Sequence, residues 1–99
     1  MLRGSKRLIE TELVVIPGIE SSLAPLIKQF SRTYPDIYIK SHPEGHEVHE
    51  PRVRIYISLY DENPERGLNV CNNALKSLIN EILSKLGSRV EIVKPCSIT

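Results

Sequence analysis

The sequence has no tryptophan, one phenylalanine and one methionine. It also has no apolar run long enough to cross a bilayer, and MLRGSKRL at its start lacks the apolar core of a signal peptide. The sequence also has no large excess of positive or negative residues: 13 lysines and arginines against 12 aspartates and glutamates give a net charge of +1. Tight nucleic-acid binding usually needs a stronger or more clustered basic excess. We therefore expect a cytoplasmic chain that does not enter membranes, and the charge balance counts against nucleic acid as its main partner.

The common catalytic motifs are also absent from the sequence. It contains no Walker loop, no G-x-G-x-x-G, no G-x-S-x-G and no C-x-x-C. Carboxylate pairs such as Asp61–Glu62 would serve as acid and base only inside a cleft that separates their pKa values. We predict no enzyme activity and no cofactor for this chain alone.

Two cysteines are present, and the predicted cytoplasmic location indicates that they are free thiols. Cys71 falls on an apolar helical face and is expected to pack in the core. Cys96 falls in a polar C-terminal tail.

The pattern of apolar residues predicts six elements. Strand-forming residues at 10–16 end at Pro17–Gly18, and a helix capped by Ser21 or Ser22 follows and ends before Pro35. Alternation predicts strands at 36–40 and 52–60, the second with every other residue apolar. Asn63 before Pro64 predicts the start of a second helix, Gly87 predicts its end, and 89–93 is the last strand.

The order β-α-β-β-α-β predicts an α+β, ferredoxin-like fold. Two helices would cover one face of a four-stranded antiparallel sheet and leave the other face open. We expect one domain over residues 9–94, with 1–8 as a tail or linker remnant and 95–99 as a tail.

The stretch YIKSHPEGHEVHE (38–50) concentrates the three histidines, His42, His46 and His49. Pro43, Gly45 and Pro51 exclude a regular helix there, so a loop from 41 to 51 is predicted. Three imidazoles in a loop can bind zinc only if they converge, and their spacing does not require this. A metal site and a solvated loop both remain open, and we favour the loop.

The face of the sheet without helices is predicted to carry aromatic and cationic side chains together. They are Tyr38, Lys40, Arg54, Tyr56 and Tyr60. Such a surface can stack the bases of RNA, or it can pack against another subunit or domain, where tyrosine and arginine are favoured. We favour the protein interface, in a homodimer or with a neighbouring domain, because the RNP signature of RNA-binding sheets is missing.

Two segments, IPGIESSLAPLI (16–27) and PDIYIKSHPEGHE (35–47), resemble the competence/damage-inducible (CinA-type) family of archaea. The resemblance covers residues 8–94 and implies the small KH-like module that accompanies molybdopterin-binding-like and nicotinamide-nucleotide amidohydrolase domains in that family. Those two domains are not in this chain, and it has no G-x-x-G loop. The resemblance therefore implies an accessory module rather than an enzyme or an RNA-binding KH domain.

The residues that carry this resemblance suggest a further site. In a ferredoxin-like fold, the start of the first helix and the end of the second strand lie at the same end of the sheet. Because helix N-termini attract anions, a phosphate or a partner's carboxylate could bind there. The candidate residues are Glu20, Ser21, Lys40, Ser41, His42 and Gly45. The alternative is that these residues only cap and close that end of the domain.

Overall fold

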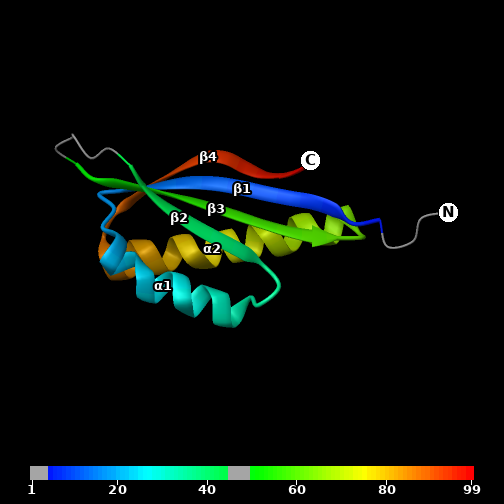
Figure 1. The fold of residues 1–99 in the computed structure, drawn as a ribbon, viewed down its shortest axis with the longest axis horizontal. Helices are drawn as coiled ribbons and strands as arrows, with labels where there is room; N and C mark the ends of the chain where they lie inside the picture. Colours follow the sequence, from blue (N-terminus) through cyan, green and yellow to red (C-terminus); the bar gives the residue numbers. More distant parts are fainter. Residues whose placement is uncertain (1–4, 45–49) are drawn as a thin grey trace.

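The computed structural model describes residues 5–44 and 50–99. It confirms the predicted order, with β1 (Arg7–Ile16), α1 (Glu20–Thr33), β2 (Tyr38–Glu44), β3 (Arg52–Asp61), α2 (Pro64–Leu86) and β4 (Arg89–Ile98). The four strands form one antiparallel sheet in the order β2-β3-β1-β4. Both helices lie on the same side of this sheet (Figure 1). No helix among the described residues is long and apolar enough to span a bilayer.

The core lies between the sheet and the two helices. Alternate residues of β1 and β3 point into it, and Ile9, Leu13, Ile55 and Ile57 are completely buried. Every second residue of these strands faces the helices, and in α2 the buried residues recur about every 3.6 positions. The buried face of α2, which includes Leu78, packs against the sheet. The alternation predicted for β3 is therefore the alternation between core and open face.

The ends of α2 follow the predicted signals. Asn63 Oδ1 accepts a hydrogen bond from the Arg66 amide at 3.1 Å, and Pro64 occupies the first turn. At the other end, Gly87 adopts the left-handed conformation with φ of 65°. A residue with a Cβ is strained there, so glycine is the natural stop.

The start of α1 differs from the prediction. The helix begins at Glu20, with Ile19 as its N-cap and no capping side chain, so neither Ser21 nor Ser22 caps it. The amides of Ser22 and Leu23 bond to the Ile19 carbonyl instead. Pro25 consequently lies in the second turn of the helix.

Two strands run through prolines that were expected to end them. β2 continues through His42 and Pro43 to Glu44, and β4 continues past Pro95 to Ile98. Both are edge strands, where a missing amide need not interrupt a ladder. The predicted loop at 41–51 is therefore shorter, and residues 95–98 are not a tail.

Candidate functional site: the open face of the sheet

The face of the sheet opposite the helices, called the open face here, carries the predicted tyrosines and cations. In the register of the sheet, Lys40 pairs with Tyr56 and Tyr56 with Glu12, while His42 pairs with Arg54. Directly paired residues in neighbouring strands point to the same side of a sheet. The open face thus includes Tyr38, Lys40, His42, Arg54, Tyr56 and Tyr60 together with Glu10, Glu12 and Glu44.

Arg54 is bonded to two carboxylates on this face. Its Nε donates to Glu44 Oε2 at 2.8 Å, and its Nη1 donates to Glu12 Oε2 at 3.0 Å. The hydrogen bond to Glu44, and then the one to Glu12, raise the pKa of the Arg54 guanidinium. The cation is therefore neutralised within the sheet, since β2 and β1 each supply one carboxylate.

Tyr56 is held in a similar way. Its hydroxyl donates to Glu10 Oε1, and this hydrogen bond, with a further contribution from burial, raises the pKa of the phenol. The ring of Tyr38 meets the ring of Tyr56 edge-on, with the two centroids 6.3 Å apart. Ring and hydroxyl of Tyr56 both have partners inside the molecule.

Two other tyrosines on the open face are exposed. The exposed fraction is 64% for Tyr60 and 55% for Tyr38. Large aromatic side chains that project from an ordered strand lose little entropy when a partner covers them. These two side chains are the part of the open face best able to gain energy from contact.

The three glutamates of the open face were not among the residues predicted to lie there. The signal was available, because ETELVVI places Glu10 and Glu12 on the face opposite Thr11, Leu13 and Val15. Once β1 is known to pair with β3, these carboxylates must face Arg54 and Tyr56. Glu44 was missed because it was assigned to a loop.

The residues suggested for an anion site do not meet at one point. Ser41 Oγ donates to Glu20 Oε2 at 2.9 Å, so β2 and the start of α1 are joined as predicted. Lys40 and His42 alternate with Ser41 and lie on the open face, away from α1. The place of the expected anion next to Ser41 is taken by the chain's own Glu20 carboxylate. Gly45 lies outside the described residues.

Only one of the three histidines can be placed. His42 is on β2 opposite Arg54, whereas His46 and His49 lie outside the described residues. Within residues 5–44 and 50–99, no three histidine, cysteine or carboxylate side chains come close enough to share a metal ion.

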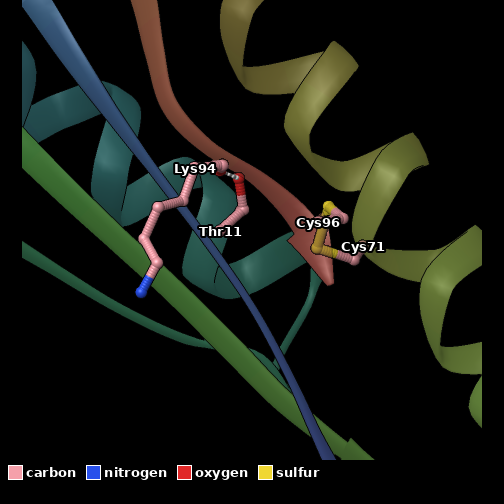
Figure 2. Close-up of a disulfide and its surroundings, with 4 residues drawn as sticks. All are labelled: Thr11, Cys71, Lys94 and Cys96. Carbon is pink, nitrogen blue, oxygen red and sulfur yellow. Dashed lines mark hydrogen bonds between the residues drawn. A yellow bond between two sulfur atoms is a disulfide. The ribbon is translucent and has the colours of Figure 1, made fainter. Parts of the chain in front are cut away.

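The two cysteines correct a prediction: they form a disulfide. Cys71 on α2 and Cys96 on β4 have Cα atoms 6.1 Å apart and their sulfur atoms are bonded (Figure 2). Free thiols were inferred from an expected compartment and from a polar tail at 95–99. Because that segment is a strand beside α2, Cys96 instead points at the buried Cys71.

A groove of about 500 Å³ lies between the two helices. Leu26, Phe30 and Leu78 line it, and the ion pair between Lys85 Nζ and Glu81 Oε1, at 2.9 Å, lies beside it. The two charged side chains that line the groove are therefore paired with each other.

Several archaeal proteins are similar to this chain in sequence. One from Pyrobaculum calidifontis is 33% identical over 87 residues, which is 87% of this chain and 33% of that protein. One from Sulfurisphaera tokodaii is 36% identical over 88 residues, or 89% of this chain and 33% of that protein. The chain thus spans about a third of the length of these relatives. No protein-family model matches it.

Two solved structures share the fold. The de novo designed protein Foldit4 superposes with a TM-score of 0.66 at 15% identity, over 93% of this chain and 98% of the design. An amidase of the hydantoinase/carbamoylase family from Burkholderia phymatum gives a TM-score of 0.60 at 16% identity, over 95% of this chain but 30% of the amidase. At these identities the similarity establishes the fold alone.

Proposed function

We propose that this chain is a non-catalytic, cytoplasmic accessory module that acts through protein–protein contacts of its open face. The observation that carries the proposal is that exposed tyrosines stand beside a cation, Arg54, that is already neutralised. Tyr38 and Tyr60 are exposed, whereas Arg54 is bonded to Glu12 and Glu44. Protein interfaces favour tyrosine and arginine, and they tolerate charges that are paired before the partner arrives.

The same face is a poor surface for nucleic acid. Phosphate contacts need cations that are free to replace counterions, and Arg54 is already bonded to two carboxylates. Glu10 and Glu12 add negative charge beside Tyr56, where a stacked base would bring its phosphate. Nucleic-acid binding through Tyr38, Lys40, Arg54 and Tyr56 is the alternative function, and the acidic neighbours make it the second choice.

For the isolated chain, the partner we propose is a second copy. The charges of the open face are separated by strand, with Arg52 and Arg54 on β3 and Glu10 and Glu12 on β1. A two-fold axis parallel to the strands places β3 of one copy over β1 of the other. Because directly paired residues of β1 and β3 then lie opposite each other, Tyr56 of each copy faces Glu12 of the other, twice in one isologous interface.

In a longer protein, the same face would pack on a neighbouring domain. The sequence relatives are about three times as long as the region they share with this chain, and the amidase holds a similar fold within 30% of its chain. The resemblance to CinA-type proteins would make that neighbour a molybdopterin-binding-like domain. The homodimer and the packing on a neighbouring domain would use the same contact surface, the open face.

Analytical ultracentrifugation from micromolar to millimolar concentration tests the proposal. We expect a reversible dimer, weakened at least tenfold by Tyr60→Glu or Tyr38→Glu, because each substitution puts a carboxylate into the contact. Leu83→Glu is the matched control: Leu83 is 48% exposed but belongs to α2, in the layer that does not contribute to the open face. A wild-type chain that stays monomeric at millimolar concentration, or equal effects of all three variants, would refute the second-copy model.

A binding experiment distinguishes the alternative function, nucleic-acid binding, from protein–protein contact. Salt-dependent binding of a single-stranded RNA in fluorescence anisotropy, lost on Tyr56→Ala, would favour nucleic acid over protein as the partner.

A further inference from the structure

The last strand, β4, is attached to the sheet unevenly along its length. Its first part pairs regularly with β1, from Ile16 opposite Arg89 to Leu13 opposite Ile92. Beyond that point the register shifts twice, between Leu13 and Glu12 and again between Glu12 and Glu10. Each shift leaves an extra β4 residue without a direct partner, as in a β-bulge. The second half of β4 therefore has a poorer ladder than the first.

The second half also has little burial to hold it. Among residues 94–98 only Cys96 is not exposed, and Pro95 has no amide to donate. Three hydrogen bonds hold it: Thr11 Oγ1 donates to the Lys94 carbonyl at 2.7 Å, and the Thr99 amide and hydroxyl donate to the Leu8 carbonyl at 2.9 and 3.3 Å. In Figure 2 the Thr11–Lys94 bond and the disulfide lie along this same segment of β4.

The disulfide is the covalent attachment of this segment. Cys71 is completely buried on α2, in the helix face that forms the core, so its position is fixed. Cys96 is only partly buried and sits on the outer edge of the sheet. A thiol reagent consequently reaches the Cys96 sulfur more easily than the Cys71 sulfur.

We propose that the Cys71–Cys96 bridge is a redox-controlled attachment: when it is reduced, residues 94–98 separate from β1 while residues 89–92 stay paired. The reductant is a dithiol. One of its thiolates attacks Cys96 Sγ and expels the Cys71 thiolate, which takes up a proton. The second thiolate of the dithiol then attacks the reductant sulfur of the mixed disulfide and expels the Cys96 thiolate, which also takes up a proton. The dithiol is thereby oxidised by two electrons to a disulfide, and both cysteines become thiols.

Separation of this segment bares the edge of β1 between Leu8 and Glu12. An uncovered edge has unpaired backbone amides and carbonyls and can accept another strand. Reduction would therefore change what this side of the domain can bind, independently of the open face and of the function proposed above.

Amide hydrogen exchange measured by NMR tests this inference. On addition of dithiothreitol we expect exchange at residues 96–99 to accelerate at least tenfold, and exchange at residues 90–92 to change less than twofold. The variant Cys71→Ser/Cys96→Ser should show the fast pattern without reductant and should not respond to it. Far-UV circular dichroism checks that this variant is folded. The reduced wild-type chain provides the same hydrogen-exchange comparison without any substitution.

Two results would overturn the inference. One is unchanged exchange at residues 96–99 after thiol labelling has confirmed complete reduction. The other is a bridge that millimolar dithiothreitol reduces only in denaturant, because the attachment would then not be controllable in the native protein.

Discussion

The substitution Gly18→Ala probes a close approach between backbone segments of the domain. Gly18 lies between β1 and α1, and its amide donates to the Pro51 carbonyl at 2.7 Å. A Cβ at this position would lie 2.6 Å from the Val15 carbonyl oxygen, 2.6 Å from the Val53 amide nitrogen and 3.0 Å from Val53 Cγ2. Val15 and Val53 are paired and buried in the two central strands, so neither can move independently.

The expected loss of stability follows from two opposing effects. Ordinary contact begins near 3.4 Å, so 3.4 − 2.6 gives a displacement of 0.8 Å at each backbone atom. Overpacking of this kind costs about 1–3 kcal/mol. Replacing glycine by alanine also restricts the unfolded chain, which returns about 0.4–1 kcal/mol. We expect the free energy of unfolding to fall by roughly 1–2 kcal/mol, and the midpoint temperature by about 4–8 °C for each kcal/mol.

Urea unfolding followed by circular dichroism at 222 nm measures this change. Lys76→Ala is the control, because Lys76 is exposed on α2 and alanine there brings no atom closer to its neighbours. We expect the control to stay within about 0.5 kcal/mol of the wild type. A Gly18→Ala protein as stable as the wild type would show that the turn relaxes freely and that crowding does not select glycine.

Two further predictions concern charged groups. Arg54→Met removes two charge-assisted hydrogen bonds that are partly exposed, and we expect the free energy of unfolding in urea to fall by about 1–2 kcal/mol. Lys85→Met, which breaks an exposed helical ion pair, is the control and should lower it by less than about 0.5 kcal/mol. Bonds from Arg66 and from the Asn63 amide lower the pKa of Asp61 to about 2 from 3.8, so its contribution to stability is present above pH 3.8 and is lost as the pH falls through about 2. NMR titration of the Asp61 carboxyl should give this pKa, Arg66→Gln should raise it, and a value near 3.8 in the wild type would contradict the Arg66 contact.

The fold could be predicted because its elements carry local signals that agree. Asn63–Pro64 and Gly87 mark the ends of α2, and the strict alternation of β3 marks a half-buried strand. The errors fall where tertiary position overrides local chemistry. Pro43 and Pro95 look like chain breakers, but each lies on an edge strand where its missing amide is tolerated.

The candidate site was predictable in part for the same reason. Alternation alone placed Tyr38, Arg54 and Tyr56 on one face, and the sheet register confirms it. The partners of Arg54 and Tyr56 depend on which strands are neighbours, which no local pattern states. The disulfide was missed because Cys96 meets Cys71 only when β4 continues past Pro95.

The pairing of the first strand with the last gives the domain a compact point of attachment. Ile9 is opposite Ile98, and the start of β1 and the end of β4 lie at the same end of the sheet (Figure 1). Neighbouring strands are about 5 Å apart, so the two connections to any flanking chain leave almost side by side. A module built this way can be inserted into a surface loop of a host domain without forcing the ends of that loop apart.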